Sequence, residues 1–223
     1  MKALLYKEFK LAMHPICYIF IVLFPFMVLI PSYPIAVGFI YILSCYPILF
    51  LGANKGQQSN DLLYSTLLPV RKKDIVLARI ITVIIMQVVF MAIMSCLVPV
   101  AMLIQKNTGT TAPGLGINGY VSILAIAIIG YAIADLIYMP IYYKKGKSIV
   151  ASTLLTILGF VVYLGIFTLG IPFMPGGDNY VKVLCDSGLG IQFGFLGGAI
   201  VLSAVLHFVV YKVSAARLEK VDF

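Results

Sequence analysis

One short pattern in the sequence is of the kind that binds nucleotide phosphates. Gly146-Lys147-Ser148 matches the end of a phosphate-binding loop, in which backbone amides and a lysine surround the phosphates. The full pattern needs a glycine where Ile141 stands, and it needs a preceding strand where an apolar run lies. We therefore interpret the triplet as a basic turn and predict no ATP site in this chain.

The chain has two histidines, a residue type that can bind metals or act as a catalytic base. His14 and His207 lie at opposite ends of the chain, with no Cys or acidic residues clustered beside them in the sequence. Zinc sites need several such ligands close together. Nor do Ser, His and Asp occur in an arrangement typical of an intramembrane protease. The sequence predicts neither a metal site nor a catalytic residue.

Asp135 is an acid inside an apolar run. A carboxylate at the centre of a membrane helix disfavours insertion by roughly 2.5–3.5 kcal/mol, which the apolar neighbours offset. Asp135 is therefore expected to face protein or water rather than lipid. Two roles stay open. It could lie on a transport path or carry protons, or it could be a structural partner of a Tyr or Gln on a neighbouring helix, such as Gln87.

The longest polar, charged interruption of the apolar sequence is the stretch of residues 60 to 79. Ser59 or Asn60 can cap a helix, and Pro69 would end it. Its apolar face is formed by Leu62, Leu63, Leu67 and Leu68. The basic residues that follow, Arg71, Lys72 and Lys73, favour the cytoplasmic side of a membrane. Asp74 is expected in the first turn of the next helix, where a carboxylate stabilises the positive end of the dipole.

This stretch resembles the membrane subunits of type-2 ABC transporters, in which a coupling helix between the second and third spans docks on a separate ATPase subunit. The match lies in Leu67-Leu68-Pro69-Val70, the basic pair, Asp74 and the apolar start at residues 75 to 77. Arg71 stands where the family usually has Ser or Thr. The residues that the resemblance assigns to ATPase coupling are Asp61, Leu62, Tyr64, Leu67, Leu68, Pro69, Arg71, Lys72, Lys73 and Asp74.

The resemblance also implies partners. ATP and Mg would be bound by the cytoplasmic ABC ATPase subunit, with no cofactor in this chain, and a second permease copy or a sister permease would complete the transporter. The small size and six-span plan are similar to bacterial exporters of phenol-soluble modulin-like peptides, which implies an amphipathic peptide substrate and the cell membrane as location. The alternative is a stand-alone membrane protein, such as a secondary transporter or a small membrane enzyme.

Composition independently indicates an integral membrane protein. Hydrophobic residues make up 62% of the chain and charged residues 11%, far from the soluble-domain range of roughly 45–50% and about 25%. The net charge of +8 does not indicate a nucleic-acid partner, because the basic residues lie at the ends of apolar runs. All of them except Lys106 and Lys182 fall on one side, which predicts cytoplasmic termini by the positive-inside rule.

The apolar runs predict an all-α integral membrane fold with six transmembrane helices in one permease domain. Spans of about 20 residues leave no room for a soluble catalytic domain. The predicted order is an interfacial helix at 1–14, spans 1 and 2 at 15–53, the coupling region at 54–74, span 3 at 75–104, span 4 at 120–143, span 5 at 148–172, span 6 at 189–211, and a cytoplasmic tail at 212–223. Spans 1 and 2 are either two full crossings or a hairpin that dips in and returns.

Three helix faces carry specific expectations. On the first helix, Lys7 and Lys10 are expected to point away from an apolar face formed by Met1, Leu4, Leu5, Phe9 and Ala12. At the end of span 4, tyrosines are expected to form an interfacial belt: Tyr138, Tyr142 and Tyr143. In span 6, Gly190, Gly194 and Gly198 form a stripe that permits close helix packing, either within the subunit or between subunits.

Overall fold

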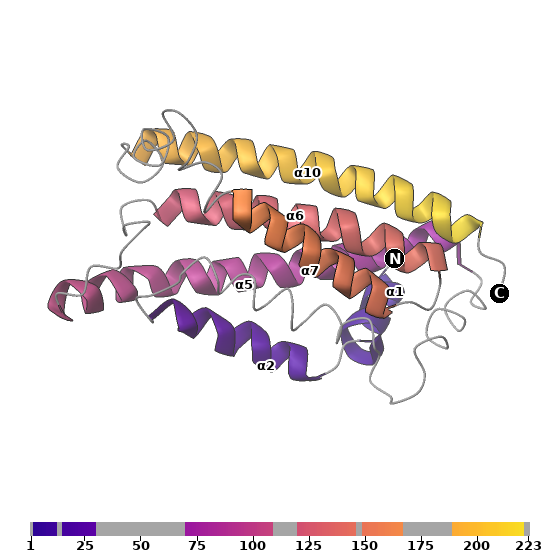
Figure 1. Ribbon diagram of the computed structural model, residues 1–223. Helices are drawn as coiled ribbons and strands as arrows, with labels where there is room; N and C mark the ends of the chain where they lie inside the picture. Colours follow the sequence, from indigo (N-terminus) through magenta and orange to yellow (C-terminus); the bar gives the residue numbers. More distant parts are fainter. Residues whose placement is uncertain are drawn as a thin grey trace.

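Long helices lie side by side in the computed structural model (Figure 1), which describes residues 2–12, 15–29, 70–108, 120–145, 149–166 and 189–220. Within these residues every regular element is helical, and no strand occurs. The predicted second span and most of the predicted coupling region lie outside the described residues. The all-α expectation therefore holds for the described part, and the count of six spans stays a prediction.

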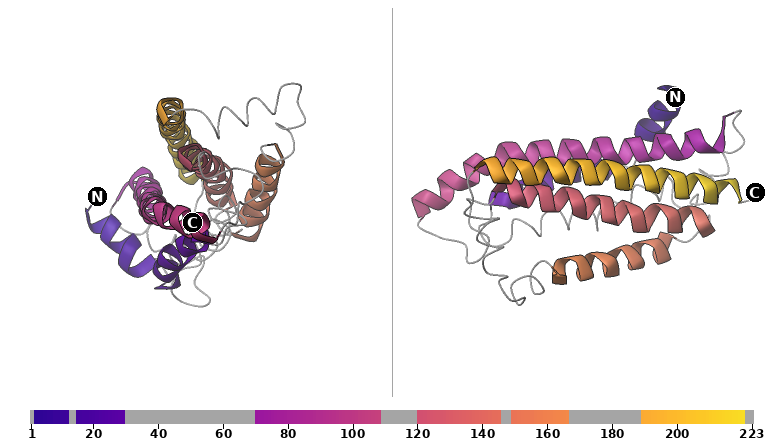
Figure 2. Two further views of the ribbon diagram at one scale, coloured as in Figure 1. Left: turned by 90° about the vertical axis from the view of Figure 1, so that its left-hand side faces the viewer. Right: turned by 90° about the horizontal axis from the view of Figure 1, so that it is seen from above.

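Three helices are long and apolar enough to cross a membrane: α5 (Lys72–Thr108), α6 (Tyr120–Lys145) and α10 (Leu189–Glu219). The shorter apolar helix α7 (Ile149–Gly165) lies against α6. In the end-on view, α6 lies between α10 and α7, and α5 lies on the side of the N-terminal helices (Figure 2). The multi-pass membrane character predicted from composition is confirmed by these spans.

The last helix is longer than its apolar run. Span 6 was predicted to end at residue 211, but α10 continues to Glu219. The apolar run stops before Lys212, but the helix continues through Lys212 and Arg217 to Glu219. Lys, Arg and Glu are polar but good helix formers. Residues 212–219 of the predicted tail therefore belong to this helix.

The N-terminal part is bent. It comprises α1 (Lys2–Lys7), the π-helical segment η1 (Glu8–Ala12), α2 (Pro15–Leu23) and the 3₁₀ segment η2 (Phe24–Leu29). The helix over Lys2–Lys10 is inclined at 80° to the one over Pro15–Phe26, and the two together meet the length and hydropathy of a fourth span. A sharp bend at this point suits a first helix that lies along the membrane surface before the chain enters it.

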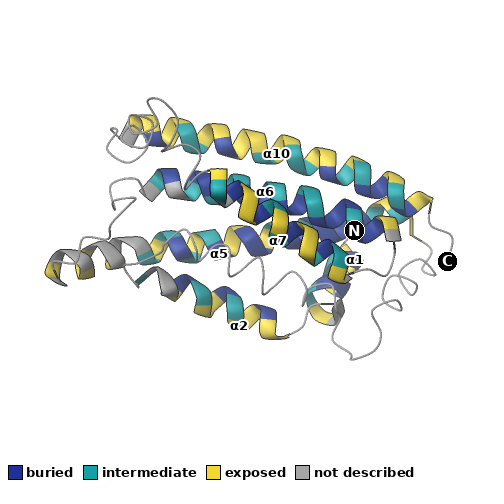
Figure 3. Ribbon diagram, in the orientation of Figure 1, coloured by how far each residue is buried: buried dark blue, intermediate teal, exposed yellow. Residues whose placement is uncertain are grey.

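The buried core lies where α5, α6 and α10 meet. Exposed residues follow the outer sides of the helices (Figure 3), and many of them are large and apolar. On α7, Val150 is 72% exposed and Leu158 is 63% exposed. On α10, Val201 is 65% exposed. A soluble protein rarely leaves such long apolar faces open, whereas lipid tails cover them in a bilayer.

Two glycines let α6 and α7 approach closely. A Cβ added at Gly130 of α6 would lie 3.2 Å from the Tyr163 ring, and one added at Gly159 of α7 would collide with the Ile137 side chain. Because the helices are close, the Tyr163 hydroxyl can donate a hydrogen bond of 2.8 Å to the carbonyl of Ile126. Small residues thus permit close helix contact where no hydrophobic effect drives association.

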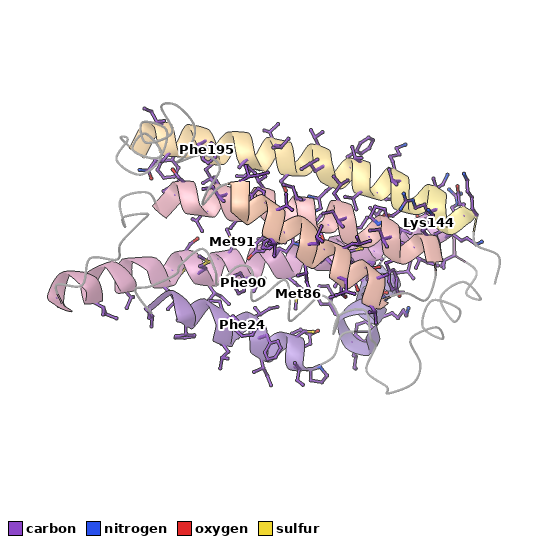
Figure 4. The ribbon with its side chains drawn as sticks, viewed as in Figure 1. Phe24, Met86, Phe90, Met91, Lys144 and Phe195 are labelled. Carbon is purple, nitrogen blue, oxygen red and sulfur yellow. The ribbon has the colours of Figure 1, made fainter. Side chains whose placement is uncertain are left out.

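Phe90 fills the space between α5 and its neighbours. It is fully buried, its ring meets that of Tyr131 edge-on at 6.5 Å, and Figure 4 shows it with Met86 and Met91 on α5, near Phe24 of η2. Phe90→Ala is expected to lower the free energy of unfolding by about 2–3 kcal/mol, from a residual cavity of roughly 100 Å³ at about 24 cal/mol per Å³.

The measurement is reversible unfolding of the purified protein in mixed micelles. Val88→Ala is the matched control, because Val88 is 61% exposed on the same helix and its truncation leaves no internal cavity. Equal losses for the two variants would contradict the assignment of Phe90 to the core.

Candidate functional site

A cluster of polar side chains lies inside the apolar bundle, and we call its members Gln87, Asp135, Ser203 and His207 the polar junction. Asp135 of α6 is 1% exposed and Gln87 of α5 is 6% exposed. Gln87 Nε2 donates a hydrogen bond of 2.9 Å to Asp135 Oδ2, and His207 Nε2 of α10 lies 3.0 Å from the same oxygen. The other ring nitrogen of His207, Nδ1, lies 2.7 Å from the Ser203 carbonyl oxygen and 3.3 Å from Ser203 Oγ.

The polar junction connects three helices through one carboxylate. Asp135 faces protein, as its position in an apolar run led us to expect, and its contact with Gln87 is present. His207 has no acidic neighbour in the sequence, but α10 packs along α6 and brings the ring to Asp135. In sequence the two residues are 72 positions apart, so local spacing carried no signal of this pair.

A second buried charge pair joins the N-terminal segment to α5. Arg79 is 6% exposed and Glu8 of η1 is 3% exposed. Arg79 Nη2 donates to Glu8 Oε1 at 3.1 Å, and Arg79 Nε contacts Glu8 Oε2. Arg79 thus makes a charge-assisted hydrogen bond to one carboxylate oxygen of Glu8 and a close ionic contact with the other. This Glu8–Arg79 clasp was not predicted from the sequence.

The clasp also changes the expected face of the first helix. Lys10 donates a hydrogen bond of 2.6 Å to the Tyr6 hydroxyl in an exposed position. Lys7, by contrast, is only 8% exposed, and its Nζ lies 3.6 Å from Glu8 Oε1. The prediction that Lys7 points away from the buried face is therefore wrong. Glu8 supplies the negative charge that allows this lysine to be buried.

The start of α5 carries the described part of the predicted ATPase-coupling set. The Arg71 carbonyl accepts hydrogen bonds from the amides of Asp74 at 2.9 Å and Ile75 at 3.4 Å. Asp74 lies in the first turn of the helix, which confirms its predicted position. Arg71 and Lys73 are exposed. Six members of the set lie outside the described residues: Asp61, Leu62, Tyr64, Leu67, Leu68 and Pro69.

Charged side chains also connect the helices at the end of the bundle where α5 begins. Lys73 of α5 forms an exposed ion pair of 3.2 Å with Glu219 of α10. Arg217 of α10 donates a hydrogen bond of 2.6 Å to the Pro140 carbonyl of α6. These contacts connect α10 with the residues that directly follow the predicted coupling helix.

The tyrosines near the end of α6 are inside the protein. Tyr138, Tyr142 and Tyr143 are at most 2% exposed, and the rings of Tyr138 and Tyr142 stack at 6.2 Å. The prediction of an interfacial belt is therefore wrong for all three. They lie on a part of α6 that the protein itself covers.

The glycine stripe of α10 faces outward. No atom of the described residues outside the helix lies within 4 Å of a Cβ added at Gly190, Gly194 or Gly198. Packing against a described helix of the same chain is therefore not observed for the stripe. Which surface meets it stays a prediction.

Chemically, the site offers one intramembrane carboxylate and one imidazole. Within the described residues, no group of three or more His, Cys, Asp or Glu residues could hold a metal ion. The polar junction is suited to hydrogen bonding and proton exchange rather than to covalent catalysis.

The family model described as ABC-2 family transporter protein matches residues 3–216. No curated protein and no solved structure gives a significant match to the chain.

Proposed function

Because the chain belongs to the ABC-2 family of transporter proteins, we propose that it is the permease of an ATP-driven bacterial exporter that moves amphipathic or hydrophobic molecules, in particular peptides. Family membership makes it a multi-pass membrane component of an ABC transporter, with an ABC ATPase as partner. The substrate, the direction of transport and the docking residues are the proposed part.

The observation that carries the substrate proposal is the scarcity of charge along the described membrane-spanning helices. A path for small hydrophilic ions needs rings of charged side chains or ordered carbonyls. Among the described residues of α5, α6, α7 and α10, Asp135 is the only acid away from the helix ends, and it is bound to Gln87 and His207. The large apolar residues exposed on these helices are aliphatic and aromatic, whereas Met86, Met94 and Met139 are buried. Apolar walls of this kind suit a ligand that is itself apolar or amphipathic.

The proposed division of labour places energy supply outside this chain. The ATPase binds ATP and Mg and pushes on the coupling region, residues 54–74, which continues directly into α5. Two permease subunits, either two copies or a copy with a sister protein, then move relative to each other and open the path. The Lys73–Glu219 and Arg217–Pro140 contacts connect α5, α6 and α10 near the coupling region. They support the proposal that a displacement of the coupling region moves all three helices.

The test is the ATPase activity of the complete complex, purified in mild detergent from native membranes and placed in nanodiscs. An amphipathic helical peptide is expected to stimulate ATP hydrolysis at low concentration, because its apolar face can bind to the apolar surfaces of the membrane-spanning helices. Sugars and inorganic ions are expected to have no effect. A scrambled peptide of equal composition without an apolar face is the matched control, and the mass of the same particle reports how many permease subunits it holds.

Two outcomes separate the levels of the proposal. Stimulation by hydrophilic solutes alone would overturn the amphipathic substrate and leave the permease role intact. A purified complex that holds no ATPase and hydrolyses no ATP would overturn the ATP-driven mechanism itself.

A further inference from the structure

The contacts of His207 define which of its ring nitrogens carries a proton. Nδ1 lies 2.7 Å from the Ser203 carbonyl oxygen, and a carbonyl oxygen only accepts hydrogen bonds. Nδ1 must therefore be the donor of this bond. The Ser203 hydroxyl is farther away, at 3.3 Å, so it competes poorly for the same nitrogen.

The second ring nitrogen then requires a further proton at its contact with Asp135. With Nδ1 protonated, a neutral ring presents a bare lone pair at Nε2, and an ionised carboxylate presents lone pairs only. Two acceptors at 3.0 Å repel each other unless one of them is protonated. Gln87 donates its own proton to the same oxygen from a different direction, so it does not remove this requirement.

From this geometry we propose that Asp135 and His207 together form a proton-binding site inside the membrane-spanning bundle. The bound proton lies between His207 Nε2 and Asp135 Oδ2. It is carried either by the ring, which gives an imidazolium beside a carboxylate, or by the carboxyl group, which gives two neutral partners. The pair is electrically neutral in both forms.

The neutral charge of the pair stabilises it because the site is buried. The side chains of Asp135 and His207 are 2% and 11% exposed. Loss of the shared proton would leave one net negative charge with no opposite charge beside it, which is strongly unfavourable in a buried site. Proton binding is therefore linked to the contact between α6 and α10, and release of the proton weakens that contact.

The helices around the pair carry further titratable and charged groups. On α5, Arg79 is bound to Glu8. On α10, Lys212 is exposed and lies over the Phe208 ring at 5.5 Å. On α7, the Tyr163 hydroxyl donates to Ile126. On α6, the neighbouring titratable groups are the buried phenols Tyr131 and Tyr138.

The proton-binding site gives the permease a pH dependence that ATP coupling alone does not supply. A proton taken up or released in mid-bundle makes the α6–α10 contact depend on pH, independently of the ATPase. This inference concerns the isolated permease, so it stands or fails separately from the proposed substrate.

The direct test uses the fact that the chain has only two histidines. In a His14→Gln background, ¹⁵N-histidine labelling followed by NMR of the permease in nanodiscs reports on His207 alone. We expect Nδ1 to be protonated at neutral pH, with the shared proton visible either at Nε2 or as a protonated carboxyl band in the infrared spectrum that disappears in Asp135→Asn. A neutral ring protonated only at Nε2, beside an ionised carboxylate, would overturn the proposal.

Two variants separate a proton site from a merely structural contact. In Asp135→Asn the amide can donate to Nε2 once Gln87 turns its amide oxygen to the same group, so the contact with His207 is kept without the shared proton. Between about pH 5 and about pH 9, the Tm of the wild type is expected to fall by at least about 4 °C, because the proton leaves the folded state. The fall in Tm of Asp135→Asn over the same pH range should be less than half as large. Ser203→Ala keeps the carbonyl and should keep the Nδ1–H form. Identical pH profiles for wild type and Asp135→Asn, or a changed tautomer in Ser203→Ala, would contradict the proposal.

Discussion

Arg79→Ala is expected to lower the free energy of unfolding by about 3–5 kcal/mol, because it leaves the Glu8 carboxylate buried without its partner. The side chains of Arg79 and Glu8 are 7% and 4% exposed, so water does little to screen the lost charge. Lys7 Nζ remains near Glu8, but at 3.6 Å it is too far for the hydrogen bond that Arg79 Nη2 makes at 3.1 Å. Unfolding of the purified protein by SDS in mixed micelles measures the loss.

Two comparisons make this prediction specific. The triple variant Lys7→Gln/Glu8→Gln/Arg79→Met removes the three charges that meet at Glu8 and should recover most of the lost stability, since buried charges can often be replaced together by uncharged residues. Lys73→Ala breaks an ion pair whose side chains are 54% and 48% exposed, and it should cost about 0–1 kcal/mol. If Arg79→Ala cost no more than Lys73→Ala, the clasp would not be a stabilising feature.

The double variant Leu67→Asp/Leu68→Asp is expected to abolish association with the ATPase. If these leucines form the apolar contact with the ATPase, two carboxylates there would be buried without partners, a loss of about 3–5 kcal/mol in binding free energy. Membrane insertion should be unchanged, because the stretch lies outside the apolar runs. The measurement is the amount of ATPase that purifies with the permease from native membranes.

Leu67→Ile/Leu68→Ile is the matched control, since it preserves the apolar character and volume at both positions. It should retain most of the ATPase. Wild-type association of the aspartate variant would place the docking surface elsewhere on the cytoplasmic side.

Sequence patterns were most informative where the cause is local. Long apolar runs identify membrane helices because the bilayer leaves the backbone no alternative to internal hydrogen bonds. Asp74 could be placed in the first turn of α5 because helix ends favour carboxylates there. Asp135 could be assigned to a protein-facing position, because a lipid-facing carboxylate is costly.

Features that depend on distant parts of the chain were not predictable. The Glu8–Arg79 and Asp135–His207 pairs join residues 71 and 72 positions apart, and hydropathy does not reveal which helices will be neighbours. The burial of Tyr138 shows the same difficulty at the level of a helix face. Its depth in the membrane could be inferred, but whether lipid or protein covers it is decided by how α6 packs.

The Glu8–Arg79 clasp also imposes an order on biosynthesis. Glu8 is made 71 residues before Arg79, which at roughly 5–20 residues per second is a delay of about 4–14 s. Throughout this interval the carboxylate has no guanidinium to meet, so it favours water over the protein interior. The N-terminal segment can therefore close onto α5 only after that helix has begun to emerge.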